Sequence, residues 1–114
     1  MMPSPRRYTR IPADEPRLLE GLRLFNQSRY FEAHEAWEAL WHEVGGRQRE
    51  WLQGLIQVAV ARHHLRRGNT AGAAYLLRRA EAHRRRGGRP RVGIPLGALI
   101  RQTVRDAGRS AAGS

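Results

Sequence analysis

The chain has 114 residues, of which 40% are hydrophobic and 27% charged, so its length and composition are those of one folded globular domain. It contains no cysteine, which excludes disulfides, thiolate zinc sites and thiol redox chemistry. No apolar run approaches the roughly twenty residues that cross a bilayer, and no hydrophobic segment follows the basic N-terminal residues, so we expect a cytoplasmic protein with no membrane partner.

The positive charge is unevenly distributed along the chain. The formal net charge is +11, and all 21 basic residues are arginine, a usage that together with abundant Ala and Gly is typical of codon bias in a GC-rich genome. Residues 11–50 carry eight acidic side chains and five Arg, whereas residues 51–91 carry ten Arg and one acidic residue, Glu81. The chain is therefore arginine-rich and electrically polarised.

The N-terminal residues 1–13 predict a flexible arm, because they contain three Pro and three Arg and show no periodic apolar pattern. Asp14 then offers a side chain that can cap a helix. Pro16 is tolerated at a first helical position, where its missing N–H would be unpaired in any case. The three-to-four spacing of the apolar residues that follow predicts an amphipathic helix ending near residues 26–28.

Two further helices are predicted, each ended by a pair of small residues. The second spans residues 31–44 and is stopped by Gly45-Gly46, since glycine can adopt the left-handed conformation that closes a helix. The third spans residues 47–67 and is stopped by Gly68-Asn69. Most of this third helix is apolar all round, which is typical of a helix surrounded by other helices, and we expect it to form the centre of the core.

A fourth helix is predicted over residues 70–86, where Gly87-Gly88 breaks it, and a shorter fifth over residues 96–107. We therefore expect a single helical domain over residues 14–108 and a disordered tail over residues 109–114.

A weak internal repeat relates residues 28–37 to residues 68–77, and both segments read as a helix, a turn of small residues and a helix. Stacked helical hairpins of this kind occur in helical repeat proteins, but those usually need at least three units to be stable. The fold class predicted is all-α, a compact bundle of about five helices built from two stacked helical hairpins.

Two blocks of the sequence resemble one known family. The first is FNQSRYFEAHEAWEALW at residues 25–41, and the second is QGLIQVA at residues 53–59, followed by His64, Gly68-Asn69 and Gly72-Ala73. A weaker closing segment contains Pro90, Gly93-Ile94 and Leu99. The pattern resembles the bacterial and archaeal family catalogued as domain of unknown function 309, over roughly residues 18–105. The resemblance implies a small all-helical fold and assigns no reaction, ligand or catalytic residue.

Ionisable side chains are predicted along one edge of the second helix, beside Trp41. His34, Glu35 and Glu38 fall within about 100° of arc together with His42. Residues four apart lie one turn above each other, so His34 and Glu38 can contact. A His and a Glu so placed can bind a divalent metal or act as a base and its orienting partner.

The third helix carries a matching polar stripe, formed by Gln53, Gln57 and His64 on an otherwise apolar surface. Buried amides must find hydrogen-bond partners, because an unsatisfied one costs about 1–3 kcal/mol. If the two stripes face each other, they form a polar seam that is either a structural network or the wall of a ligand pocket. The candidate ligand-binding residues are His34, Glu35, Glu38, Trp41, Gln53, Gln57 and His64.

A metal site is a weaker alternative, with His34, Glu38 and His64 as its candidate ligands. The helical zinc-protease motif and the paired Glu-x-x-His motifs of di-iron proteins are both missing from the sequence. We therefore predict no cofactor and leave a divalent metal as an open alternative.

Seven arginines near the end of the fourth helix form the most basic stretch of the chain. They are Arg78, Arg79, Arg84, Arg85, Arg86, Arg89 and Arg91. Cations are favoured at a helix C-terminus, so part of this run has a local structural reason. The run could also bind nucleic-acid phosphates, but no helix-turn-helix, zinc-finger or RNA-binding signature accompanies it.

The sequence therefore predicts a non-catalytic binding or scaffolding module, with an unknown protein or small molecule as its partner. One alternative is a metal-binding protein or hydrolase using His34, Glu35, Glu38 and His64. Another is nucleic-acid association through residues 78–91. A homodimer is left open.

Overall fold

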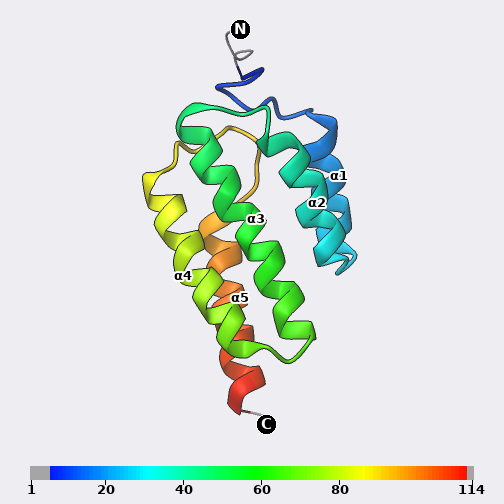
Figure 1. Ribbon diagram of the computed structural model, residues 1–114, viewed down its shortest axis with the longest axis vertical. Coiled ribbons are helices and arrows are strands. Elements are labelled where there is room, and N and C mark those ends of the chain that lie inside the picture. The colour runs from blue at the N-terminus through cyan, green and yellow to red at the C-terminus, as the bar shows by residue number, and fades with distance from the viewer. Residues whose placement is uncertain (1–5, 113–114) are drawn as a thin grey trace, which may run out of the picture.

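Five α-helices form the computed structural model, which describes residues 6–112 as an elongated bundle of 53 × 29 × 26 Å (Figure 1). They are α1 (Pro16–Asn26), α2 (Tyr30–Trp41), α3 (Gly46–Arg66), α4 (Thr70–Arg86) and α5 (Leu96–Ala112). None of these helices is long and apolar enough to cross a bilayer. The all-α prediction is confirmed.

The helices pair as two hairpins with one helix added. α1 packs against α2 and α3 against α4, while contacts between α2 and α3 join the two hairpins and α5 packs on α3 and α4 (Figure 1). The turn between α3 and α4 uses Gly68 in the left-handed region, with φ of 78°, and the Asn69 side chain accepts a hydrogen bond from Gly72 N at 2.9 Å. The prediction of a bundle of stacked hairpins is confirmed.

The centre of the core is α3, as its apolar sequence predicts. Nine of its residues are buried, running from Trp51 through the middle of the helix to Ala61. Because α2, α4 and α5 all pack on α3, almost every direction around its axis is covered by another helix. Within the buried stretch from Trp51 to Ala61, the polar side chains Gln53 and Gln57 must therefore lie at boundaries between helices.

The start of α1 differs in detail from the prediction. Glu15, only 4% exposed, caps the helix in place of Asp14: its Oε2 accepts a hydrogen bond from Arg17 N at 2.7 Å. Pro16 occupies the first helical position as expected. The carboxylate of Glu15 also pairs with the Arg17 guanidinium, which in turn contacts Glu43. This ion pairing explains how an acidic side chain is held in a buried position.

Residues 6–13 lie against the body of the protein, although the sequence predicts a flexible arm over residues 1–13. Tyr8 N donates to Glu43 O at 2.9 Å, and Gly45 N donates to Tyr8 O at 2.7 Å. Ile11 is buried and its N–H donates to Gln48 Oε1 at 2.6 Å. This backbone pairing explains why α2 ends at Trp41, three residues before the predicted end. Residues 1–5 lie outside the described residues.

The last helix is longer than predicted. α5 extends to Ala112, so residues 109–112, expected to belong to a disordered tail, are helical. Residues 113–114 lie outside the described part of the chain.

One close approach fixes the geometry of the first hairpin. Trp37 is fully buried, and its Nε1 donates a hydrogen bond to Leu18 O at 3.1 Å. The indole lies directly on the backbone of Gly21, where a β-carbon would be 2.1 Å from Trp37 Nε1. A residue without a side chain is therefore required at position 21 for α1 and α2 to pack this closely.

We predict that Gly21→Ala lowers the free energy of unfolding by about 3 kcal/mol, because the methyl group must displace a buried indole and break its hydrogen bond. Urea denaturation measures the effect. Gly108→Ala is the control, since a β-carbon there meets no atom within 4 Å, and alanine at this helical position should be neutral or stabilising. Equal stabilities of the two variants would contradict the packing described.

Candidate functional site

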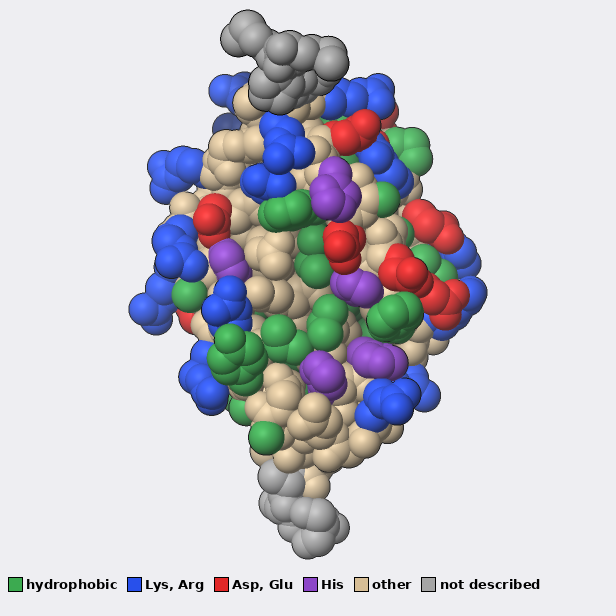
Figure 2. Space-filling view, in the orientation of Figure 1, with side chains coloured by type: hydrophobic (Ala, Val, Ile, Leu, Met, Phe, Trp, Pro, Cys, Tyr) green, Lys and Arg blue, Asp and Glu red, His purple; other side chains and the backbone are tan. Residues whose placement is uncertain are grey.

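The candidate residues of α2 lie on the face of the molecule where α2 and α3 run side by side, and histidine side chains gather there (Figure 2). His34 Nε2 lies 2.9 Å from Glu38 Oε2, which confirms the predicted contact, and His34 Nδ1 lies 2.9 Å from Phe31 O. Both ring nitrogens of His34 therefore face hydrogen-bond acceptors. Glu35 is exposed and makes no hydrogen bond or ion pair within residues 6–112.

A second histidine, His63, belongs to this surface although it was not among the predicted candidates. The ring of Phe31 lies 5.1 Å from the ring of His34 and 5.3 Å from that of His63, so it separates the two imidazoles. Burial lowers the pKa of His63, and the nearby charges of Arg67, His64 and His34 lower it further. Phe31 itself is an exposed aromatic residue.

His64 does not join His34 and Glu38. Its Nδ1 lies 3.3 Å from Asn69 Nδ2, at the turn between α3 and α4. Within residues 6–112, no group of three or more His, Asp or Glu side chains is arranged to hold a metal ion. The metal set His34, Glu38 and His64 therefore has no geometric basis in the described structure.

The upper part of the same face is hollowed between α2, α3 and α4. The hollow has a volume of about 450 Å³ and is named here the Trp41 hollow. Its lining residues are Trp41, Gly45, Gly46, Arg49, Glu50, Gln53, Arg79 and His83. The structure thus brings together Trp41 and Gln53, two of the predicted ligand-binding candidates, with Arg79 of the arginine stretch. It adds three charged or ionisable side chains that the sequence did not identify, Arg49, Glu50 and His83.

The wall of the Trp41 hollow is held by two specific contacts. The guanidinium of Arg49 lies 3.5 Å from the centre of the Trp41 ring, a cation–π contact. Across the hollow, Glu50 Oε2 lies 2.5 Å from His83 Nδ1, and this hydrogen bond lowers the pKa of Glu50. Glu50 and His83 belong to different helices and are 33 positions apart. The spacing of residues within one helix therefore could not predict the contact between Glu50 and His83.

Three buried polar atoms near this boundary are sealed from solvent and make no hydrogen bond within the described residues. They are the donors Trp41 Nε1 and Arg49 Nε and the acceptor Gln57 Oε1. Trp41 and Arg49 line the hollow, whereas Gln57 does not. Gln57 is only 6% exposed and lies one turn beyond Gln53 on the same side of α3. The structure shows no hydrogen bond from His34, Glu35 or Glu38 to the glutamines of α3. The two polar stripes therefore do not form the mutual network that the sequence favoured.

Part of the arginine stretch is neutralised by one carboxylate. Arg84 donates two hydrogen bonds to Glu81, at 2.7 and 2.5 Å, and Arg85 donates a third at 3.2 Å. These bonds, the Arg84 pair above all, lower the pKa of Glu81 from 4.5 to about 2. Arg86 Nε lies 3.9 Å from Glu50.

The remaining arginines of the stretch are divided among different surfaces. Arg79 lies 5.7 Å from the Tyr75 ring and lines the Trp41 hollow, whereas Arg78 lines a groove between α4 and α5. Arg84 and Arg89 face a third region, at the start of α5. Arg91 is exposed and lines none of these hollows. The stretch is therefore not one continuous basic face.

The fold and this surface define a small all-helical protein with a polar, incompletely paired boundary between its two central hairpins. The chain belongs to the family described as Domain of unknown function (DUF309), whose model matches residues 18–76. A solved structure, the conserved hypothetical protein TTHA0068 from Thermus thermophilus, is similar with a TM-score of 0.68 and 34% identity, over 79% of this chain and 94% of that one.

A second relative is similar over a shorter segment. Over 50 residues the chain is 52% identical to the uncharacterized protein YpuF of Bacillus subtilis (strain 168). The match covers 42% of this chain and 28% of the length of that protein. The family resemblance inferred from the sequence is confirmed.

The surroundings of His63 predict a pH effect. Because its pKa is lowered in the folded state, protonation favours the unfolded chain, so stability falls as the pH drops below the ordinary histidine value of about 6.5. In an NMR titration, we expect the His63 ring to titrate below that value and Arg67→Gln to raise its midpoint. Arg66→Gln is the charge-matched control, since that guanidinium bonds Ser28 O. Equal shifts in both variants would contradict the assignment.

Proposed function

We propose that the protein is a non-catalytic binding module whose ligand or partner occupies the Trp41 hollow between α2, α3 and α4. The observation that carries the proposal is the buried, unpartnered donor Trp41 Nε1, whose residue lines the hollow. An unsatisfied buried polar group costs about 1–3 kcal/mol, so a ligand that accepts a hydrogen bond from this atom recovers energy that the free protein lacks.

The chemistry of the lining favours an amide-bearing ligand. The indole nitrogen of Trp41 requires an acceptor, while the carboxylate of Glu50 and the side-chain oxygen of Gln53 can accept from a donor. A peptide group carries one of each, whereas a carboxylate or a phosphate carries acceptors only. The Arg49 guanidinium stacked on Trp41 forms a flat wall, and the Glu50–His83 pair provides charge on the opposite side. A short peptide segment of a partner protein fits this combination, which supports a scaffolding role.

The state of His34 supports binding over catalysis. Both of its ring nitrogens lie at hydrogen-bond distance from acceptors, so neither is free to remove a proton from a substrate. Glu35 is exposed and makes no hydrogen bond or ion pair within residues 6–112 that would orient it. His34, Glu35 and Glu38 thus lie outside the Trp41 hollow, and the proposed binding does not depend on them.

The first test asks whether the buried side-chain oxygen of Gln57 lacks a partner or is already hydrogen-bonded within the protein. We predict that Gln57→Met raises the free energy of unfolding by about 1 kcal/mol, because it removes an unpaired buried acceptor while conserving volume. Urea denaturation measures the change, and Gln102→Met at an exposed position of α5 is the control, with no expected effect. A loss of stability in Gln57→Met would show that the amide is already paired within the protein.

The second test measures binding. Capped tripeptides with acetyl and amide ends are titrated against the protein while the indole N–H signals are followed by NMR. We expect the Trp41 signal to move and the affinity to fall about tenfold in Trp41→Phe, the loss of one buried hydrogen bond. Glu35→Gln, outside the hollow, should bind normally.

Two results would contradict the proposed function. One is the absence of any shift with the whole set of tripeptides. The other is turnover of 4-nitrophenyl acetate or 4-nitrophenyl phosphate that is abolished when His34→Ala and Glu38→Ala are combined, since this would make the face catalytic.

A further inference from the structure

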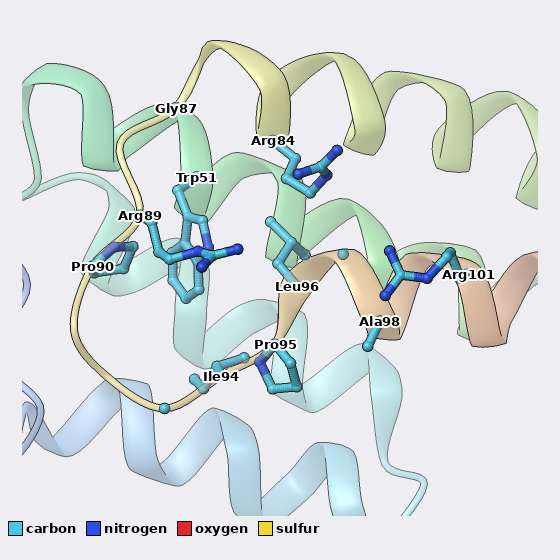
Figure 3. Close-up of a pocket in the computed structure, with 12 residues that line it drawn as sticks. Trp51, Arg84, Gly87, Arg89, Pro90, Ile94, Pro95, Leu96, Ala98 and Arg101 are labelled. Carbon is cyan, nitrogen blue, oxygen red and sulfur yellow. The ribbon is translucent and has the colours of Figure 1, made fainter.

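A second hollow, of about 480 Å³, lies on a different side of α3, between the C-terminal end of α4 and the start of α5 (Figure 3). Trp51, which is 3% exposed, forms part of its wall, and the loop that follows α4 closes one side. We name it the Trp51 hollow. It shares no lining residue with the Trp41 hollow.

Three guanidinium groups converge on this space from three segments of the chain. Arg84 comes from α4, Arg89 from the loop and Arg101 from α5, and Figure 3 shows all three side chains directed toward the same volume. No acidic side chain lines the hollow. Only Arg84 has a carboxylate partner within residues 6–112, since Arg89 and Arg101 make no ion pair there. Arg89 and Arg101 thus bring positive charge to the hollow without a paired carboxylate, and an anion there relieves the repulsion among the guanidinium groups.

The backbone at Gly97 brings two of these groups close together. A β-carbon at this position would lie 3.3 Å from Arg101 Nη1 and 3.7 Å from Arg84 Nε. Both guanidinium groups therefore flank the same point on the first turn of α5. The absence of a side chain keeps that point open to a small ligand.

Backbone donors add to the arginines at this point. Leu96 N donates to Ile94 O and Leu99 N donates to Pro95 O. The amides of Gly97 and Ala98 have no acceptor among the described residues. Trp51 is almost completely buried in the wall of the hollow and packs there as an apolar surface. The hollow thus presents many donors and no competing acceptor side chain.

We propose that the Trp51 hollow binds a phosphate monoester. Guanidinium groups pair with phosphate oxygens in a bidentate manner, and each supplies several N–H donors. Arg84 bonds Glu81 through Nε and Nη2, which leaves its Nη1 beside the guanidinium groups of Arg89 and Arg101. These donors and the two amides match the three terminal oxygens of a phosphate better than the two oxygens of a carboxylate. Pro90, Ile94 and Pro95 give the rest of the wall an apolar character suited to the organic part of a phosphorylated small molecule.

A terminal phosphate fits this site better than a nucleic-acid strand. The arginines converge on one bounded space, whereas a strand needs basic residues spaced along an open path. The other arginines of the region lie on separate surfaces.

Calorimetry with phenyl phosphate in a neutral HEPES buffer of low ionic strength tests the proposal. Arg101→Gln should weaken binding about tenfold or more, as expected for the loss of hydrogen bonds between charged groups. Arg105→Gln is the matched control: it lies one turn further along α5, removes the same charge and does not line this hollow. We expect its affinity to stay within about twofold of the native value, because only long-range, screened attraction is lost.

The Gly97→Ala variant tells binding in the Trp51 hollow apart from a general attraction between the basic protein and an anion, because the substitution changes no charge. The new methyl group narrows the space between Arg84 and Arg101, so phenyl phosphate should bind more weakly. The melting temperature should not fall, since alanine favours a helix more than glycine does and the Arg101 tip can move aside.

Benzoate and single-stranded DNA are titrated in the same way, for comparison with phenyl phosphate. Phenyl phosphate binding tighter than benzoate supports the proposal. Equal loss of affinity in Arg101→Gln and Arg105→Gln, equal binding of phenyl phosphate and benzoate, or no binding of phenyl phosphate would overturn it. So would tight DNA binding that both variants weaken alike, because this would identify a diffuse nucleic-acid surface.

Discussion

The enclosure of α3 by other helices is the constraint on which the rest of the structure depends. Where α3 is covered on nearly all sides, from Trp51 to Ala61, its polar side chains cannot point into water and lie at boundaries between helices. Gln53 and Gln57 follow one such boundary, and the exposed charges of α3, Arg47 and Arg66, lie at its two ends. The position of every candidate site follows from this arrangement of the core.

The two hollows lie on different sides of the N-terminal part of α3. Glu50 and Trp51 are neighbours in the sequence, but the rotation of about 100° per residue points one into the Trp41 hollow and the other into the Trp51 hollow. The first contains donors, acceptors and both signs of charge, whereas the second contains arginine alone as its charged residue type. The two hollows therefore differ in charge: the Trp41 hollow contains both acidic and basic side chains, and the Trp51 hollow contains basic side chains only.

Most of the fold could be predicted from the sequence because periodicity and small-residue breaks are local signals. They placed all five helices, the central position of α3 and the contact between His34 and Glu38. They could not predict that Glu15 caps α1, since Asp14 is the stronger capping type, or that Tyr8 pairs with the backbone after α2.

The candidate sites could be predicted less well than the helices, because they depend on how the helices pack together. Arg49 on Trp41, the Glu50–His83 pair and the convergence of Arg84, Arg89 and Arg101 all join separate turns or helices, so no spacing in the sequence encodes them. The predicted seam was wrong in its partners: His34 pairs within its own helix and His64 pairs with Asn69.

The indole N–H signals give the most direct test of the claim that the boundary beside α3 is built for a ligand. The chain has three tryptophans, and Trp37 provides an internal reference because its Nε1 is bonded to Leu18 O. In the ligand-free protein, we expect the Trp41 proton to resonate upfield of the Trp37 proton, as a donor without an acceptor should. A Trp41 signal shifted downfield as far as that of Trp37 would show that its hydrogen bond is already made, and the boundary would then be purely structural.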